Sequence, residues 1–301
     1  MATKAQRNAF QNTANGHQRA VVELLEELAC RNGMARAFSD FVEVCAIVLS
    51  KADLQASDRR EARYLEVIKG YSRDDLERFV AAFAHLQMAF QACFSATDEA
   101  SAPLPYSVAF ADILGQIYMM LDMGNAGTGQ FFTPYPVSLL MAQMLTDGCA
   151  DQVARGEFIR LQEPACGAGG MVLAQAQALS DRGINYQVHM HAHLIDVDRT
   201  CVHMAFVQLS LACVPAEILH GNALNGEVWD RWYTPIHVLG GWSARLRFNR
   251  AREALSVPAT QARPEGEAAR RAAPEPAPVP AAFQHARTGP APAPRDQLAL
   301  F

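Results

Sequence analysis

Hydrophobic residues recur at helical spacing through the first third of the chain. Between Arg19 and about Phe94, apolar side chains return every three or four positions, the pattern of helices that bury one face. Ser72, followed by Asp75, is typical of a helix N-terminus, and it precedes the last of these apolar runs. The repeated Phe and Met residues favour the core of a helical bundle over a cofactor-lining role. We therefore expect a helical N-terminal domain over residues 1–104.

The period of the pattern changes in the middle of the chain. Residues 105–125 predict one more helix and a glycine-containing loop, and residues 157–224 then alternate strand, helix, strand, helix, strand. Strands that alternate with helices are typical of a parallel sheet. We therefore expect an α/β domain over residues 105–250.

The composition changes abruptly after about Leu255. Nine of the sixteen prolines lie between Pro258 and Pro294, interspersed with Ala, Arg and Glu. Such a segment buries too little apolar surface to offset the entropy that is lost on ordering. Residues 251–301 are therefore expected to form a disordered, Pro/Ala-rich tail.

Composition and charge narrow the class of protein. The chain has 301 residues, half of them hydrophobic, which is enough for one large or two modest domains. A net charge of −5 gives no global basic field for nucleic acids, although a local patch could still bind them. The seven cysteines form no Cys-x-x-Cys pair, and the chain has neither a signal peptide nor an apolar run of about 18 residues. We expect a cytoplasmic protein with reduced, buried thiols and no membrane segment.

The most informative segment is a glycine-rich loop. Residues 163–171 read Glu-Pro-Ala-Cys-Gly-Ala-Gly-Gly-Met, between an apolar strand and a helix-forming run. Glycines at Gly167, Gly169 and Gly170 tolerate positive φ and let the backbone approach a ligand without a Cβ in the way. The carboxylate of Glu163 can meet a cationic or hydroxyl-bearing ligand. A tight turn that binds nothing is the alternative interpretation.

Three further segments strengthen the ligand interpretation. They are Gly-Gln-Phe-Phe-Thr-Pro at 129–134, Leu-Ile-Asp-Val-Asp at 194–198 and His-Gly-Asn-Ala-Leu at 220–224. In this order and at these spacings, the four segments resemble the adenine-N6 DNA methyltransferases, most closely the modification subunits of type I restriction systems. The resemblance covers roughly residues 105–225. The chain departs from the family pattern with Glu163 for Asp, Ala168 for Ser and Asn222 for Asp.

The resemblance implies a truncated, Rossmann-like methyltransferase domain that binds S-adenosylmethionine. It assigns the pocket around the methionine part of the cofactor to the side chains of Phe131, Thr133 and Pro134. The backbone of Cys166, Gly167 and Gly169 would hold the same part of the cofactor. Glu163 would order the loop or meet the ammonium group.

The adenosine part of the cofactor would be held at the next two strand ends. Asp196 follows Leu194 and Ile195 at the end of the second strand, where a carboxylate can accept hydrogen bonds from both ribose hydroxyls. A solvated strand-end or helix-capping Asp is the alternative. Asp198 is expected to cap the following helix. By resemblance, Asn222 would bond the adenine through its amide.

The catalytic motif of the family is missing. Methylating adenine N6 requires a flipped base stacked on an aromatic ring, and the family uses (Asn/Asp/Ser)-Pro-Pro-aromatic at the end of its fourth strand. The chain has no Pro-Pro dipeptide. At the corresponding distance, 237–239 predict an apolar strand end, followed by Gly240, Gly241 and Trp242. Trp242 could stack on a base, but neither glycine could orient the amine. Residues 232–235 are a second candidate for the catalytic motif, with the residues in the wrong order.

Two other motifs need an interpretation. His189, His191 and His193 alternate along a predicted strand, which superficially suggests a metal site, but no Cys or carboxylate at convincing spacing accompanies them. We interpret them as partly buried or sheet-edge histidines and expect no metal. The chain ends in a peptide that resembles the one by which bacterial DNA-processing proteins bind the replication sliding clamp, with Gln297, Leu298, Leu300 and Phe301 as its contact residues.

Two main hypotheses follow. In the first, the chain is an S-adenosylmethionine-dependent adenine-N6 DNA methyltransferase of a restriction-modification type that needs a partner or specificity subunit for target recognition. In the second, it is an inactive relative that acts as a DNA-associated regulatory protein recruited through the sliding clamp. A nicotinamide-linked enzyme is a weaker third option, because the Gly-x-Gly-Gly pattern and the segment at 129–134 disfavour it.

Overall fold

The computed structural model describes residues 10, 14–96, 106–121, 123 and 132–256. The chain divides into two compact units, Met1–Arg250 and Ala251–Phe301. The expected domain boundary at residue 104 falls outside the described residues, and so does the predicted tail from residue 257 onward. None of the helices in the described part is long and apolar enough to cross a membrane.

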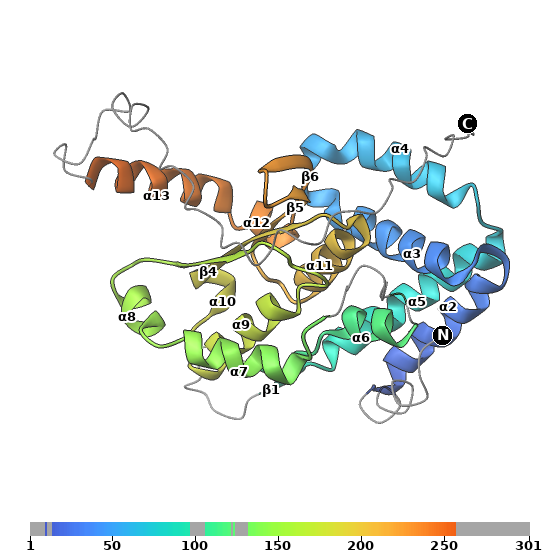
Figure 1. Ribbon diagram of the computed structural model, residues 1–301, viewed down its shortest axis with the longest axis horizontal. Coiled ribbons are helices and arrows are strands. Elements are labelled where there is room, and N and C mark those ends of the chain that lie inside the picture. Colours follow the sequence, from blue (N-terminus) through green and yellow to red (C-terminus); the bar gives the residue numbers. More distant parts are fainter. Residues whose placement is uncertain (1–9, 11–13, 97–105, 122, 124–131, 257–301) are drawn as a thin grey trace, which may run out of the picture. The chain divides into compact units, whose positions relative to one another are not determined.

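The N-terminal part is helical, as the sequence predicts (Figure 1). A capping box formed by Asn15 and Gln18 opens the first of its helices. The predicted helix start at Ser72 is confirmed for α5, where Ser72 and Asp75 form a second capping box. Helices α2, α3 and α5 pack against one another through their apolar faces. The elements are α2 (Gly16–Asn32), α3 (Met34–Leu49), the 3₁₀ turns Ser50–Ala52 and Leu54–Ala56, α4 (Ser57–Ile68) and α5 (Arg73–Gln91).

A small hairpin and three helices connect this part to the main sheet. Strand β1 begins at Phe94, where the predicted helical stretch ends, and pairs antiparallel with β2. Helix α7 begins after Pro134 and packs on α9. The connecting elements are β1 (Phe94–Ala96), β2 (Tyr106–Val108), α6 (Ile113–Met120), α7 (Tyr135–Leu145) and α8 (Cys149–Ala154).

The main sheet has the order β3-β4-β5-β6 among the described residues. The predicted alternation of strands and helices is confirmed, because β3, β4 and β5 are parallel and α9 and α11 connect them. Strand β6 follows β5 directly and runs antiparallel to it, with a bulge between His220 and Gly221. The elements are β3 (Ile159–Glu163), α9 (Gly170–Asp181), α10 (Tyr186–His189), β4 (Met190–Asp196), α11 (Arg199–Leu211), β5 (Ala216–Asn222) and β6 (Glu227–Tyr233).

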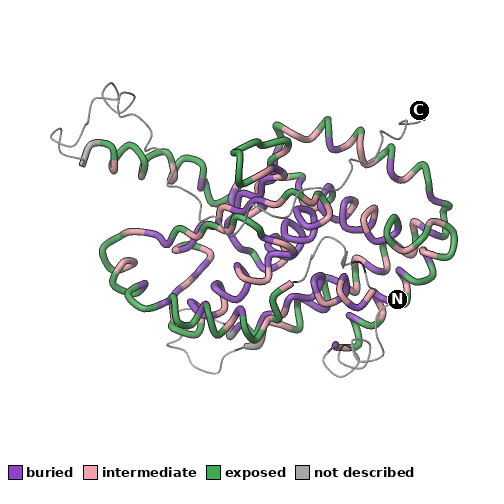
Figure 2. The backbone as a smooth tube through the Cα atoms, viewed as in Figure 1, coloured by how far each residue is buried: buried purple, intermediate pink, exposed green. Residues whose placement is uncertain are grey.

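One face of the sheet belongs to the hydrophobic core. Met190, Ala192 and Leu194 of β4 are fully buried there and pack in a core that includes residues of α9, α11 and the N-terminal helices. Figure 2 shows the same concentration of buried backbone in β4, β5 and the adjoining helices. The N-terminal helices and the sheet therefore share one continuous core. This core places the carboxyl ends of β3, β4 and β5 side by side.

The segment after β6 differs from the sequence prediction. The apolar stretch 237–239 was expected to end a strand, but Pro235–Leu239 form the short helix α12, and Trp242–Ser256 form α13. Proline at the first helical position favours this helix, because its fixed φ suits a helix start and its missing N–H is not needed there. A fourth parallel strand that would carry the family's catalytic motif is thus not formed by 237–239.

Two of the seven cysteines also differ from expectation. Cys30 and Cys213 are exposed, whereas the other five are buried or half-buried. All seven are free thiols.

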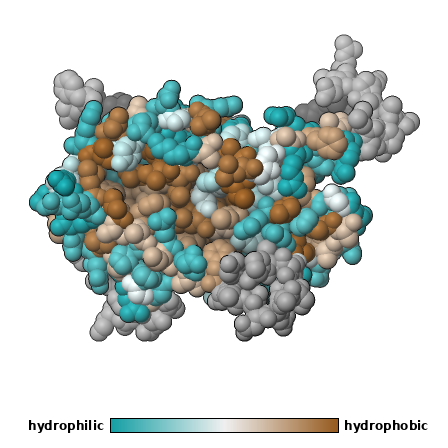
Figure 3. Space-filling view, turned by 180° about the vertical axis from the view of Figure 1, so that it is seen from behind, coloured by the Kyte–Doolittle hydropathy of each residue, from teal (hydrophilic) through white to brown (hydrophobic). Residues whose placement is uncertain are grey.

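Hydrophobic side chains also gather at the surface of the N-terminal part. Figure 3 shows them on the side of the molecule where the N-terminal helices lie. A groove of about 200 Å³ between α3, α4 and α5 is lined there by Val44, Cys45, Val48, Tyr64, Val67, Ile68, Tyr71, Leu76, Phe79, Val80 and Phe83.

A buried histidine in α11 makes stability dependent on pH. His203 is 1% exposed, packs on Trp232, and neither of its ring nitrogens has a hydrogen-bond partner among the described residues. Burial lowers the pKa of His203 to about 3 from 6.5. Below pH 6.5 the unfolded chain binds a proton that the folded chain does not, so stability falls as the pH falls.

We expect the His203→Leu variant to lose this pH dependence. Between pH 6.5 and 4.5, the wild type should lose about 1.4 kcal/mol of unfolding free energy per pH unit through this side chain alone. The variant should be more stable than the wild type at pH 5.5, with a smaller difference at pH 7.5. Urea unfolding at the two pH values measures this, and an equal difference at both would contradict the assignment.

Candidate functional site

The glycine-rich loop lies at the carboxyl end of β3. Two of the hydrogen bonds that fix it join backbone groups: Cys166 N donates to the carbonyl of Ile195 (3.1 Å), and Gly169 N donates to the carbonyl of Cys166 (2.8 Å). The first of these bonds ties the loop to the end of β4. Gly167 and Gly169 have φ values of 51° and 88°, the left-handed region that side chains disfavour.

Close packing on Gly167 explains why a glycine stands there. A Cβ at this position would lie 2.9 Å from the ring of Phe132, which in turn lies against Tyr118 with 5.3 Å between ring centroids. A Cβ on Gly169 would touch the backbone and side chain of Ala205 in α11 at 3.4 Å. The loop is therefore held between the segment that follows residue 131 and helix α11.

Asp196 lies where the sequence predicts, at the end of β4 and beside the loop. Its Oδ2 accepts a hydrogen bond from Gly167 N (2.8 Å), and its Oδ1 accepts one from Asp198 N (2.9 Å). Burial raises the pKa of Asp196, and these two backbone bonds oppose the effect. Each oxygen keeps a second lone pair, so the half-buried carboxylate can still accept hydrogen bonds from two hydroxyl groups.

Two neighbouring polar residues organise the adjacent turns. The predicted role of Asp198 is confirmed, since its side chain accepts a hydrogen bond from Thr200 N at the start of α11. At the end of β5, Asn222 accepts a hydrogen bond from Leu224 N through its side-chain oxygen (2.9 Å). The turn thus uses the amide oxygen of Asn222, and the amide nitrogen remains as a donor toward a ligand.

Glu163 ends β3 on the same edge of the sheet. Its carboxylate accepts a hydrogen bond from Ala165 N at 3.4 Å. Burial raises the pKa of Glu163, and the negative charge of Asp196 acts in the same direction. The two carboxylates therefore repel each other across the loop, and a cationic group between them would be stabilised.

The thiol of Cys166 has no chemical role that the structure supports. It is buried, and burial raises its pKa well above the usual value, so it stays protonated. Its Sγ donates a hydrogen bond to the carbonyl of Gly167 (3.7 Å), and its backbone bonds to Ile195 and Gly169.

A buried glutamine of α11, which the sequence did not indicate, holds the loop through the carbonyl of Ala168. Gln208 of α11 is fully buried and donates from Nε2 to Asp112 Oδ1 and to the carbonyl of Ala168, both at 2.7 Å. Its Oε1 accepts a hydrogen bond from Leu114 N (3.0 Å), and Asp112 also accepts from Gly115 N. The only sequence signal was an amide within a mostly apolar stretch of α11.

Thr133 and Pro134 lie at the entrance to α7, directly after Phe132. Both are exposed, and Pro134 is the residue before the first turn of that helix. Because Phe132 lies on Gly167, the chain brings this segment next to the glycine-rich loop. Phe131 falls outside the described residues.

The structure does not bring the candidate catalytic residues to this edge. Trp242 is 1% exposed, and its ring packs on Phe158, which precedes β3, and on His191 near the start of β4. The guanidinium carbon of Arg245 lies over the indole, 3.8 Å from its centroid. Trp242, together with Gly240 and Gly241 before it, therefore lies toward the amino ends of the strands, away from Asp196. The interpretation of these three residues as a degenerate catalytic motif has no geometric support.

The alternating histidines are partly buried, and they do not share one strand. His189 ends α10, and the strand begins only at Met190. His191 Nε2 lies 2.8 Å from His237 Nδ1, and burial lowers the pKa of these two histidines to about 3 and about 4. Within the described part of the chain, no group of three or more His, Cys, Asp or Glu side chains is placed to hold a metal ion.

The arrangement defines a class of site. A parallel sheet, a glycine-rich loop after one strand and a carboxylate at the end of the next form the arrangement with which α/β proteins bind adenosine-containing cofactors. Gly167 lets the loop pack closely against the ring of Phe132, and Asp196 supplies acceptors for ribose hydroxyls. These residues fit S-adenosylmethionine.

Comparison with known proteins gives the same class. The family model described as N-6 DNA Methylase matches residues 109–239, which include the loop, Asp196 and Asn222. The match implies S-adenosylmethionine as the cofactor and DNA as the substrate of the family. No curated protein matches the chain.

A solved structure is also similar to the chain. It comes from Listeria monocytogenes and is provisionally assigned as a class I S-adenosylmethionine-dependent methyltransferase. The similarity has 17% identity and a TM-score of 0.38 and covers 72% of this chain. The chain spans 57% of that protein's length, and this TM-score does not establish a shared fold.

Proposed function

We propose that this chain binds S-adenosylmethionine at the carboxyl ends of β3, β4 and β5 and works in adenine-N6 methylation of DNA. One observation carries the proposal: the Asp196 carboxylate is bonded to Gly167 N, so the ribose acceptor and the glycine-rich loop form a single site. The family match over residues 109–239 supports the same reaction class. Glu163 would meet the ammonium group, Thr133 and Pro134 would shape the methionine end with Phe131, and Asn222 would donate to the adenine.

The chain would need a partner to present the target base. Trp242 is buried away from the site, and Gly240 and Gly241 carry no side chain that could accept the protons of the adenine amine. A partner or specificity subunit of the kind found in type I restriction systems would supply the base-binding half. The competing proposal is an inactive relative that binds the cofactor and regulates DNA-associated events.

We expect Asp196→Ala to weaken S-adenosylmethionine binding about 100-fold. The change removes two hydrogen bonds from ribose hydroxyls to a charged acceptor, each about 1.5 kcal/mol. Isothermal titration of the full chain measures the dissociation constant.

The matched control for this experiment is Asp198→Ala. Asp198 lies two residues away and caps α11, so its loss should cost about 1 kcal/mol of stability and leave the dissociation constant within about threefold. Equal loss of affinity in both variants would mean that Asp196 acts through the stability of the turn and would contradict its role as the ribose acceptor.

Methyl transfer separates the catalytic proposal from its inactive competitor. Labelled methyl from S-adenosylmethionine is offered to unmethylated duplex DNA, and N6-methyladenine is scored, with Asp196→Ala as the control. Label that vanishes in the control would establish an active enzyme. If the wild type binds the cofactor but transfers no label, even with a cognate partner subunit, the result would favour the competing proposal of an inactive relative that binds the cofactor.

Recruitment by the sliding clamp remains a proposal from the sequence. Gln297, Leu298, Leu300 and Phe301 lie outside the described residues. Binding to the clamp through these residues would raise the local concentration of the chain near DNA. Deletion of 297–301 should abolish binding to the clamp, and unchanged binding, or none by the intact chain, would remove this proposal.

A further inference from the structure

The second face of the sheet has an unusual composition. Parallel strands normally bury apolar side chains on both faces. Here only the face toward α9 and α11 is apolar, because polar residues alternate with apolar ones along β3 and β4. The side chains of the second face are Arg160 and Gln162 of β3, His191, His193 and Ile195 of β4, Glu217 and Leu219 of β5, and Arg231 and Tyr233 of β6.

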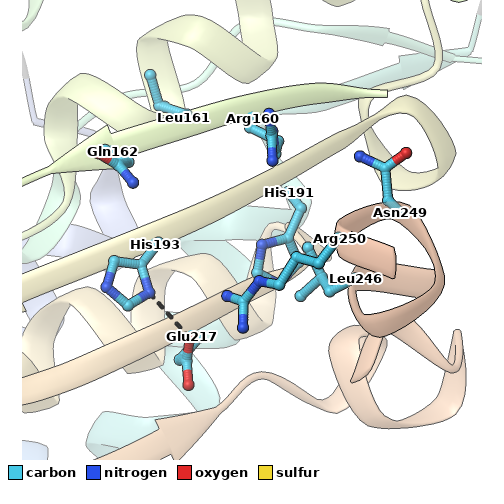
Figure 4. A pocket seen from close by; sticks show the side chains of 9 residues that line it. All are labelled: Arg160, Leu161, Gln162, His191, His193, Glu217, Leu246, Asn249 and Arg250. Carbon is cyan, nitrogen blue, oxygen red and sulfur yellow. Dashed lines mark hydrogen bonds and ion pairs between the residues drawn. The ribbon is translucent and has the colours of Figure 1, made fainter. Parts of the chain in front are cut away.

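A cavity of about 550 Å³ opens on this polar face (Figure 4). Its volume lies in the range that holds a small molecule of nucleotide size. The walls come from the three parallel strands and from residues 246–250 of α13, all within the unit Met1–Arg250. The lining residues are Arg160, Leu161, Gln162, His191, His193, Glu217, Leu246, Asn249 and Arg250.

A buried carboxylate fixes the histidine in the middle of this cavity. Glu217 is 7% exposed; its Oε2 accepts a hydrogen bond from His193 Nδ1 (2.9 Å), and its Oε1 pairs with Arg231. Because a carboxylate can only accept, the proton of neutral His193 lies on Nδ1 and its Nε2 is left for a ligand. The His193 side chain is 41% exposed, so a ligand can reach it.

Cationic side chains surround this histidine. Figure 4 shows the guanidinium of Arg250 extending from α13 toward His193 and Glu217, while Arg160 projects from β3 into the same space. Burial lowers the pKa of His193, and the charges of Arg231 and Arg250 lower it further. The guanidinium groups of Arg160 and Arg250 thus line the cavity, and Arg231 pairs with Glu217 beside it.

We propose that this cavity binds the phosphate group of a nucleotide-sized ligand, held by Arg160 and Arg250 with His193 beside them. Planar guanidinium groups suit phosphate oxygens, and the polar wall of Gln162 and Asn249 suits a sugar or base. The phosphate comes from a free nucleotide or from a DNA strand. None of its lining residues belongs to the glycine-rich loop, and a neighbouring pocket that shares Gln162 and His193 with it reaches Glu163 and Pro164 at the carboxyl end of β3.

Titration of the full chain with thymidine 5′-monophosphate tests the proposal. This probe carries a phosphate but no adenine, so it does not compete for the adenosine pocket. Isothermal titration should show binding that weakens about tenfold in Arg160→Ala and in Arg250→Ala, since each loses a charge-assisted hydrogen bond. The ring signals of His193 in nitrogen-correlated NMR spectra should move on titration.

Arg247→Ala is the matched control. Arg247 is an exposed arginine on α13 that does not line the cavity, so its loss should leave the affinity unchanged. The second probe is an oligo-dT strand, used at the same total concentration of phosphate groups. The probe with the lower dissociation constant identifies the source of the phosphate. No binding of either probe, or an equal loss in Arg247→Ala, would overturn the proposal.

Discussion

Replacing Gln208 with leucine should destabilise the protein by about 2 to 6 kcal/mol. The change removes three hydrogen bonds at a fully buried position and leaves the carbonyl of Ala168 and the N–H of Leu114 without this partner, while Asp112 Oδ1 keeps its bond from Gly115 N. Each buried group that loses its partner costs about 1 to 3 kcal/mol. Burial already raises the pKa of Asp112, and loss of the amide donor would raise it further.

The effect of Gln208→Leu should extend to the cofactor. Ala168 lies inside the glycine-rich loop, so a released carbonyl allows the loop to move, and S-adenosylmethionine affinity should fall along with stability. Ser210→Ala is the control, because its buried hydroxyl on the same helix has no hydrogen-bond partner among the described residues. Urea unfolding compares the free energies of unfolding of the two variants. A Gln208→Leu protein whose free energy of unfolding lies within about 0.5 kcal/mol of the wild-type value would contradict the role of Gln208 in holding the loop.

Replacing Trp242 with alanine should cost about 3 to 5 kcal/mol of stability, as for other buried tryptophans. The indole is almost fully buried and contacts Phe158, His191 and Arg245 at the amino ends of β3 and β4. Trp242→Phe should keep most of this packing and should bind S-adenosylmethionine as the wild type does. The cofactor affinity is therefore expected to be independent of this aromatic ring.

This pair of variants separates a structural tryptophan from a catalytic one. Trp229, which is half-exposed on β6, provides the control, and Trp229→Ala should cost less than about 1 kcal/mol. Thermal unfolding and methyl-transfer assays are run on all three variants. If the wild type transfers methyl groups and Trp242→Phe does not, although its stability equals that of the wild type, Trp242 would have a catalytic role.

Local signals in the sequence predicted the parts of the fold that local chemistry determines. The capping boxes and the N-cap at Asp198 depend on side chains within three residues of a helix start, and the structure confirms those that were predicted. The alternation of strands and helices likewise follows from the hydrophobic period. The position of Asp196 beside Gly167 was expected because the carboxyl ends of parallel strands meet at one edge.

Features that depend on distant contacts could not be predicted. Gln208 reaches Asp112, which lies 96 residues away in the sequence, and no local pattern indicates that pairing. The run 237–239 is too short for its period to distinguish helix from strand, and Pro235 favours the helix that forms there. The bond between His193 and Glu217 depends on the register of β4 and β5, which the sequence alone does not set.

A crystal structure of the chain with S-adenosylhomocysteine tests the central claim most directly. The account predicts that the adenosine lies at the carboxyl ends of β3, β4 and β5, with both ribose hydroxyls bonded to Asp196 and the methionine part against the backbone of Cys166 to Gly169. Ligand density elsewhere, or a ribose that makes no contact with Asp196, would contradict it.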